Sequence, residues 1–439
     1  MPTRNFELLL QDLHPPLSAH EATVESDRCY FCYDAPCVTA CPTGIDIPLF
    51  IRQIKTGNPS GSARTIFDEN ILGGMCARVC PTETLCEQVC VRNTAEDNPV
   101  RIGELQRYST DHLMATGKQP YTRAADTGLR IAVVGAGPAG LACAHRLSLY
   151  GHSVVIHDAR PKPGGLNEYG IAAYKTVDNF AQAEVDYILS IGGITIKPNQ
   201  VLGSDIHLAQ LAQDYDAVFL GLGLGAVNDL NIDGAELAGV EDAVDFIATL
   251  RQAEDFSGID IGTHTVVIGG GMTAVDAAVQ SKMLGSEDVT LVYRRGIENM
   301  NASGFEQDLA KVNGVLIRTW LQPLRVLGES GAVTGVEFSV MSDVDGAYKP
   351  TGETRLIACD RVLKAIGQQF HSVSGEPVLE MEKGRIMVDA DCRTSDERIW
   401  AGGDCAYGGD DLTVTAVQDG KLAAESIHST LQAAARKAG

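Results

Sequence analysis

The chain has 439 residues, of which 44% are apolar and 21% are charged. This composition excludes a disordered, collagen-like or coiled-coil chain, and at about 150 residues per domain the length predicts about three domains. The 35 basic and 57 acidic residues give a net charge of −22, which argues against a nucleic-acid partner because an acidic surface repels phosphate. We find neither an apolar run approaching the roughly 18 residues of a membrane span nor the pattern of a signal peptide. We therefore expect a cytoplasmic protein without a membrane partner.

Eight of the twelve cysteines lie in the first 90 residues, in two runs. The runs are Cys29-x2-Cys32-x4-Cys37-x3-Cys41-Pro and Cys76-x3-Cys80-Pro-x4-Cys86-x3-Cys90. Thiolates at such spacings bind metal, and both zinc and iron–sulfur clusters are compatible with them. The first run resembles bacterial ferredoxin, although its central spacing departs from that pattern by two residues. A disulfide framework is not expected in a cytoplasmic protein.

A buried strand, an apolar helix and a second strand follow from residue 129, and they predict a βαβ unit. Gly135-x-Gly137-x-x-Gly140 lies between the first strand and the helix. These glycines allow a tight turn, close approach of a pyrophosphate and close helix–strand packing. Asp158 ends the second strand, where it can accept hydrogen bonds from a ribose.

The same pattern returns later in the chain, which predicts a second dinucleotide-binding unit. Its fingerprint is Gly269-x-Gly271-x-x-Ala274, and its second strand ends in Arg294 and Arg295 instead of an acid. An acid binds the 2′-hydroxyl of NAD, whereas arginine can pair with the 2′-phosphate of NADP. The arginines therefore favour NADPH, and NADH stays open because either arginine could simply solvate the strand end.

Other segments resemble flavoproteins that contain two dinucleotide-binding domains. The run IWAGGDCA resembles their C-terminal motif, and a last helix is predicted from residue 413 to 435. The N-terminus of such a helix would stabilise a reduced, anionic flavin. We expect contacts with FAD from Gly165, Leu166, Lys175, Asp404 and Thr413.

Nearly the whole chain resembles one family, which includes the small subunit of glutamate synthase and the dihydropyrimidine dehydrogenases. The segments that carry the resemblance are RCYFCYDAPCVTACP, GGMCARVCPTETLCEQVC, IGELQRYSTD, VVGAGPAGL, GGGMTAVDAA and AGGDCAYGGDDLTVTAVQDGK. The resemblance implies an α/β flavoprotein with two Rossmann-like domains, preceded by an α-helical domain that holds two [4Fe–4S] clusters. The implied boundaries are 1–125 for the helical domain, 126–258 with 370–439 for the FAD domain, and 259–369 for the NAD(P) domain.

The resemblance also implies a division of the cluster ligands. One cluster would be held by Cys29, Cys32, Cys37 and Cys90, and the other by Cys41, Cys80, Cys86 and Gln106. A glutamate synthase subunit would be expected to have Glu near the place of Gln106, so the glutamine favours the pyrimidine branch of the family. Cys76 is then spare. The alternative is that Cys76 is the eighth ligand and Gln106 is an ordinary helix residue.

By this resemblance the chain is an oxidoreductase, the electron-input subunit of dihydropyrimidine dehydrogenase. It would transfer hydride from NAD(P)H to FAD and pass electrons through two clusters to an FMN/iron–sulfur partner subunit, in a hetero-oligomer that reduces uracil or thymine. The alternatives are a glutamate synthase small subunit, another NAD(P)H:ferredoxin-type subunit, or a zinc-bearing interaction domain on a degenerate flavoprotein. A disulfide reductase is excluded because none of the four later cysteines has a partner at CxxC or similar spacing.

Overall fold

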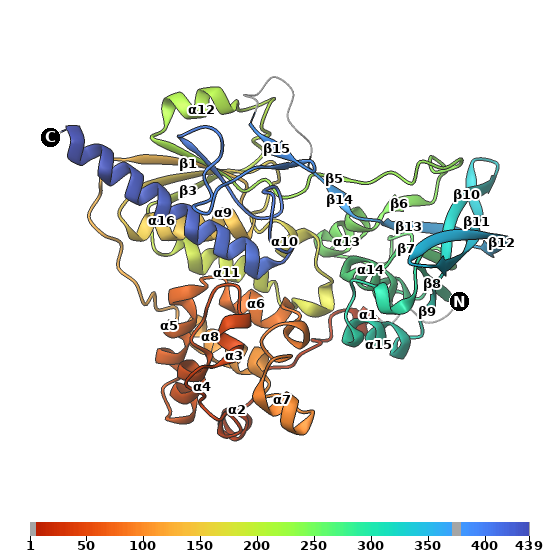
Figure 1. Cartoon of the computed structure of the whole chain (residues 1–439), viewed down its shortest axis with the longest axis horizontal. Helices are drawn as coiled ribbons and strands as arrows, with labels where there is room; N and C mark the ends of the chain where they lie inside the picture. Colours follow the sequence, from red (N-terminus) through yellow and green to blue (C-terminus); the bar gives the residue numbers. More distant parts are fainter. Residues whose placement is uncertain (1–5, 371–378, 439) are drawn as a thin grey trace. The chain divides into compact units, whose positions relative to one another are not determined.

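The computed structural model describes residues 6–370 and 379–438 (Figure 1). The chain divides into two compact units. The first-fingerprint unit comprises residues 14–168, 178–225 and 370–439, and the second-fingerprint unit comprises residues 1–13, 169–177 and 226–369. Within the described ranges, no helix has the length and apolar character needed to cross a membrane.

Short helices form the cysteine-bearing part of the first-fingerprint unit. They are α2 (Ala19–Asp27), α3 (Pro36–Ala40), α4 (Ile47–Lys55), α5 (Pro59–Glu69), α6 (Gly73–Val79), the 3₁₀ turn Thr82–Thr84, α7 (Val91–Glu96) and α8 (Ile102–Ala115). Side chains close in sequence cap the N-termini of several of these helices. Ser18 and Glu21 form a capping box at α2, and Asp46 and Asn58 cap α4 and α5. Helices this short depend on tertiary packing for their stability, and the apolar faces of α2, α4, α5 and α8 share one core.

A five-stranded parallel sheet, in which Figure 1 labels β1 and β3, forms the rest of this unit. Its strand order is β17-β4-β1-β2-β3. The strands are β1 (Arg130–Val134), β2 (Ser153–His157), β3 (Ile194–Lys197), β4 (Ala217–Leu220) and β17 (Ile399–Ala401). The helices of this part are α9 (Pro138–Leu149), α10 (Leu166–Tyr169), α11 (Phe180–Leu189), α12 (Leu208–Asp214) and α16 (Thr413–Ala438). A small hairpin joins β15 (Met381–Glu382) to β16 (Arg385–Ile386). The strand order reverses between β1 and β4, and ligands of such sheets bind at this switch point, beyond the carboxyl ends of the strands.

The last helix packs directly on the first fingerprint helix. α16 and α9 lie side by side, and a Cβ atom on Gly420 would stand 2.1 Å from the carbonyl oxygen of Ala139. Only glycine allows this approach. The predicted final helix is therefore confirmed, and it is anchored beside the fingerprint.

The second-fingerprint unit repeats the same topology. Its parallel sheet has the order β6-β13-β7-β8-β9, with β6 (Val240–Asp242), β7 (His264–Gly269), β8 (Asp288–Val292), β9 (Leu316–Arg318) and β13 (Arg361–Ala365). Its helices are α1 (Phe6–Leu9), α13 (Ala243–Gln252), α14 (Met272–Met283) and α15 (Gly304–Val312), with 3₁₀ turns at Ala173–Lys175 and Ile297–Asn299. β7 and β8 occupy the places that β1 and β2 have in the other sheet, which confirms the predicted repeat.

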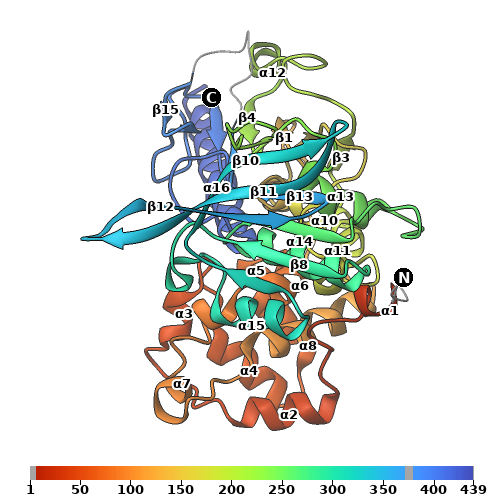
Figure 2. The same ribbon diagram turned by 90° about the vertical axis from the view of Figure 1, so that its right-hand side faces the viewer.

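An antiparallel sheet extends this unit (Figure 2). It consists of β10 (Leu321–Glu329), β11 (Ala332–Val344) and β12 (Ala347–Ala358). Two short strands, β5 (Ala226–Val227) and β14 (Gln368–Gln369), pair where the chain enters and leaves the unit. This place differs from the boundary expected near residue 258. The reason is that β6 pairs with β13 and α13 packs behind it, so residues 240–252 belong to the second sheet.

We predict that Gly140→Ala destabilises the protein, because its Cβ atom would lie 1.9 Å from the carbonyl oxygen of Gly135. Overpacking of this kind costs about 1–3 kcal/mol. Gly137→Ala is the matched control, since its Cβ would meet nothing nearer than Gly165 Cα at 3.8 Å. Chemical denaturation of both variants measures the effect. Equal stability of the two variants would contradict the packing argument.

Candidate functional site

The first fingerprint forms a tight turn at the switch point of its sheet. Gly135 has φ +103°, and a Cβ atom there would lie 2.2 Å from the carbonyl oxygen of Gly221, at the end of β4. Gly137 is the N-cap of α9, so the free N–H groups of this helix face the turn. Gly165 packs against Gly137. The first fingerprint and the segment that carries Gly165 thus lie together at the N-terminus of α9.

Asp158 lies directly after β2 and is bound to the fingerprint loop. Its carboxylate accepts hydrogen bonds from the N–H of Ala136 at 2.6 Å and of Arg160 at 2.7 Å. Burial nevertheless raises the pKa of Asp158 above its usual value. The carboxylate is therefore fixed in place, as a ribose ligand needs to be.

Asp404 follows β17, close to the start of α16. Burial, with smaller effects of Asp411 and Asp419, raises the pKa of Asp404 to about 6, although Arg385 lowers it. Asp419 accepts a hydrogen bond from the Gly403 N–H at 2.8 Å, so the helix holds the turn that carries Asp404. A half-buried carboxylate of this kind is stabilised by donors from a ligand, such as the hydroxyls of a ribityl chain.

Thr413 and Lys175 have different surroundings. The Thr413 hydroxyl donates to the side-chain oxygen of Asn167 at 2.9 Å, next to Leu166 at the start of α10. Lys175 belongs to the second-fingerprint unit, where its Nζ lies 2.8 Å from Asp276 and 2.7 Å from Glu306. The sequence did not reveal these two carboxylates as partners of Lys175, because they follow it by more than a hundred positions.

The second fingerprint is built like the first. A Cβ atom on Gly269 would lie 2.3 Å from the carbonyl oxygen of Ala365, at the end of β13. Gly271 is the N-cap of α14, and Ala274 is fully buried. Tyr293 holds the position after β8 that Asp158 holds after β2, and its ring lies against Gly270. A tyrosine thus replaces the acid, and sequence patterns did not single it out.

The two arginines after β8 are not equivalent. Arg294 is exposed, whereas the guanidinium of Arg295 lies over the ring of Tyr348 on β12, 5.1 Å from the ring centroid. The Tyr348 hydroxyl in turn donates to the side chain of Asn299 at 3.4 Å. Arg295 is thereby packed against an aromatic ring, whereas the side chain of Arg294 is in contact with solvent.

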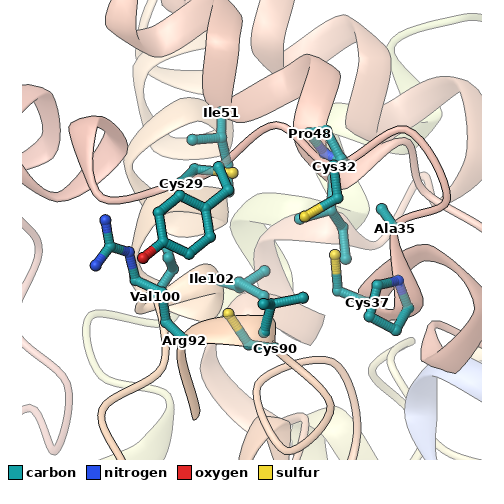
Figure 3. Close-up of a pocket in the computed structure, with 14 residues that line it drawn as sticks. Cys29, Cys32, Ala35, Cys37, Pro48, Ile51, Cys90, Arg92, Val100 and Ile102 are labelled. Atoms are coloured by element: carbon teal, nitrogen blue, oxygen red, sulfur yellow. The ribbon is translucent and has the colours of Figure 1, made fainter. Parts of the chain in front are cut away.

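Four cysteines surround one open cavity in the helical part (Figure 3). They are Cys29, Cys32, Cys37 and Cys90, the set expected for one cluster. The rest of the lining is mainly apolar and includes Ile51 and Ile102. Burial and the neighbouring thiols raise the pKa of Cys37 to about 12. A ligand that binds these thiolates therefore has to displace protons.

The other four cysteines form a second group. The Cys80 thiol hydrogen-bonds to the Cys76 thiol; this bond, loss of solvent and the nearby Cys86 and Cys41 hold its pKa well above the usual value. Gln106 on α8 is 8% exposed, and its Nε2 donates to the carbonyl oxygen of Gly73 at 2.7 Å. Its side-chain oxygen is the atom that could bind a metal. Cys76 lies on α6, and Gln106 contacts Gly73 of the same helix. Both candidates for the eighth ligand are therefore close to α6.

The donor sets fit the expected groups. Soft thiolates in apolar surroundings are the ligands of iron–sulfur clusters. In the described part of the chain, no three or more His, Cys, Asp or Glu side chains are close enough together to hold a metal ion, so the fit to a cluster is one of ligand type and not of distance. The later cysteines, Cys143, Cys359, Cys392 and Cys405, are all buried, as expected for packing residues.

Two protein-family models match the chain. The model described as dihydropyrimidine dehydrogenase domain II, 4Fe-4S cluster, matches residues 6–118. The model described as pyridine nucleotide-disulphide oxidoreductase matches residues 129–420. The cofactor classes predicted from the sequence are therefore confirmed: [4Fe–4S] clusters, FAD and a nicotinamide nucleotide.

Individual proteins show the same relationship. The NAD-dependent dihydropyrimidine dehydrogenase subunit PreT of Escherichia coli (strain K12) is 36% identical over 434 residues, with 99% of each chain covered. The glutamate synthase (NADPH) small chain of the same strain is 34% identical, covering 96% of this chain and 94% of that protein. The structure of Mycobacterium tuberculosis FprA in complex with NADPH has a TM-score of 0.61 at 20% identity, covers 71% of this chain and 86% of that chain, and shows the fold alone.

We predict that Asp404→Asn weakens FAD retention about tenfold or more, since a hydrogen bond to a charged group contributes about 1.5–3 kcal/mol. Asp410→Asn, an exposed neighbour on the same loop, is the matched control. Flavin content after gel filtration, with iron content measured in parallel, tests this. Full flavin occupancy in Asp404→Asn would remove Asp404 from the site.

Proposed function

Because the chain belongs to the family of iron–sulfur flavoproteins that includes the PreT subunit and the glutamate synthase small chain, we propose that it is the electron-input subunit of a dihydropyrimidine dehydrogenase. The 36% identity over 99% of both chains carries this proposal. A partner subunit with FMN and iron–sulfur centres carries the pyrimidine site and reduces uracil or thymine. The two chains form a hetero-oligomer in the cytoplasm.

When bound, FAD accepts hydride from the nicotinamide nucleotide as an electron pair, and [4Fe–4S] clusters carry electrons singly. The protein supplies the binding and orientation. The N-terminus of α9 would face the FAD pyrophosphate, Asp158 would hold the ribose and Asp404 the ribityl chain, with Gly165, Leu166 and Thr413 completing the site. The N-terminus of α14 would face the nicotinamide nucleotide in the same way.

We assign one cluster to Cys29, Cys32, Cys37 and Cys90, and the other to Cys41, Cys80, Cys86 and Gln106. The cavity that the first four cysteines line supports the first assignment. The contact of Gln106 with Gly73, three residues before Cys76, supports the presence of its amide near the second group. An amide ligand in place of a thiolate removes one negative charge, which shifts the potential of a cluster.

The two groups of cysteines differ in their exposure to solvent. This difference suggests which cluster passes electrons to the partner. Cys76 and Cys86 are buried. Every cysteine of the first group is partly exposed, and Tyr30 and Tyr33 beside them are 54% and 100% exposed. Cys41 and Cys80 of the second group are partly exposed as well, so the second group is the more buried of the two, and we propose that electrons leave for the partner at the first group. Exposed tyrosines are typical of protein interfaces.

We propose NADH as the coenzyme. Two arginines after β8 favoured NADPH, but only Arg294 is exposed, whereas Arg295 is half-buried over Tyr348. A relative that is 36% identical is named NAD-dependent. A comparison of kcat/KM for NADH and NADPH decides this, and a preference for NADPH would restore the role of both arginines.

The alternative function is that of a glutamate synthase small subunit, favoured by the 34% identity to such a chain. The fold cannot separate the two functions, because the same electron-input module serves different partners. Their partners are chemically different, however: a pyrimidine-reducing flavoprotein in one case and an amidotransferase in the other.

We predict that the isolated chain oxidises NADH with an artificial acceptor and forms no dihydrouracil from uracil. Addition of the FMN/iron–sulfur subunit should make NADH oxidation depend on uracil, with one dihydrouracil formed per NADH. Uracil reduction by the isolated chain would contradict the division of labour. Glutamate formation with a glutamate synthase large subunit, in place of uracil reduction, would favour the alternative.

We predict that Cys76→Ser retains both clusters, whereas Gln106→Ala loses or alters the second one. Iron analysis and low-temperature EPR of the reduced protein measure this. Cys80→Ser is the positive control, since both ligand assignments include Cys80. Loss of one cluster in Cys76→Ser would make Cys76 the eighth ligand and overturn the assignment of Gln106.

A further inference from the structure

A buried lysine on the helix beside the flavin motif contacts the cysteine-bearing part of the chain. Lys421 lies on α16 and is 8% exposed. Its Nζ donates to the carbonyl oxygen of Thr43 at 3.1 Å and to the carboxylate of Glu69 at 2.7 Å. Thr43 follows Cys41 by two positions, and the Cys41 sulfur lies 3.3 Å from the Thr43 hydroxyl. A cationic group from the flavin-side helix thus stands next to the Cys41 loop.

We propose that Lys421 is a positioning residue that raises the reduction potential of the second cluster, the one held by Cys41, and fixes the Cys41 loop against α16. This inference rests on the proposed function for the presence of that cluster. It does not depend on which of Cys76 and Gln106 is the eighth ligand, because Cys41 belongs to both assignments.

The charge of Lys421 acts through a medium of low dielectric. Reduction adds one negative charge to a cluster whose thiolate ligands are already negative, so a nearby cation favours the reduced state. Glu69 opposes this effect, but the Glu69 side chain is 44% exposed whereas that of Lys421 is 10% exposed. Solvent therefore screens the carboxylate more than the ammonium group, and the net field at the Cys41 loop is positive.

Lys421 also holds the Cys41 loop in place against α16. The Lys421 ammonium bonds to a main-chain carbonyl, and the Cys41 carbonyl accepts from the Gly44 N–H at 2.9 Å, which closes a turn around Thr43. At its other end α16 begins at Thr413, bonded to Asn167 on the flavin side. One rigid helix thus joins the flavin-side segment to the loop of a cluster ligand.

The test uses the full chain and three variants: Lys421→Gln, Glu69→Gln and Lys421→Arg. The reduction potential of each cluster is measured by EPR-monitored titration, with FAD and iron contents determined for every variant. In Lys421→Gln, we expect the reduced-to-oxidised ratio of the second cluster at a fixed potential to fall about tenfold, which is 59 mV for a one-electron couple. In Glu69→Gln we expect this ratio to rise, and in Lys421→Arg to stay close to that of the wild type.

Opposite shifts of the second cluster's reduction potential in Lys421→Gln and Glu69→Gln distinguish a charge effect from damage to the Cys41 loop. The first cluster serves as an internal control, because its potential should not change. Shifts in the same direction for Lys421→Gln and Glu69→Gln, or unchanged potentials with full cofactor content, would overturn the proposal. If Lys421→Gln fails to fold, Glu69→Gln alone decides by the direction of its shift. A wild-type chain without iron would instead refute the proposed function.

Discussion

The arrangement of the redox groups depends on a buried contact between the helix that carries Cys76 and a helix of the flavin-binding part. Glu184 on α11 accepts a hydrogen bond from the Met75 N–H at 2.9 Å, at the start of α6. Burial raises the pKa of this carboxyl to about 8, although the N–H groups of Met75 and Gly74 and the charge of Arg78 lower it. Arg78 strengthens the same contact, with its guanidinium over the ring of Phe180 on α11 at 3.4 Å. The cysteine helices and the first sheet consequently form one compact unit.

Burial also affects the thiols of the two cysteine groups. Burial is the main cause that raises the pKa of Cys37 in the first group, where Cys29 and Cys90 raise it further, and of Cys86 in the second group, where Glu87 and Cys41 raise it further. Such an arrangement is costly for thiolates unless a cation or cluster binds them. The proposed ligands, seven thiols and the amide of Gln106, thus lie where burial disfavours thiolates until a cluster binds them. Lys421 and Glu184, both outside the cysteine runs, connect this region to the flavin-side helices.

The features of the fold that depend on short sequence patterns could be predicted from the sequence. Both fingerprints, the repeat and the final helix depend on spacings of a few residues or on motifs with fixed geometry. The grouping of Cys29, Cys32, Cys37 and Cys90 came from the family resemblance and not from spacing, because Cys90 lies far along the chain from the other three. Contacts between distant segments could not be predicted in this way. Lys175 pairs with Asp276 and Glu306, and β6 joins a sheet whose other strands come later, because tertiary packing brings together residues that no periodicity relates.

The central claim is that one chain conducts electrons from a nicotinamide nucleotide through its flavin to its clusters. Anaerobic addition of NADH to the isolated chain, followed by optical bleaching of the flavin and low-temperature EPR, tests this most directly. The account predicts that the flavin bleaches and that signals of reduced [4Fe–4S] clusters appear without any partner. Bleaching of the flavin in an iron-containing chain whose clusters stay oxidised would contradict it.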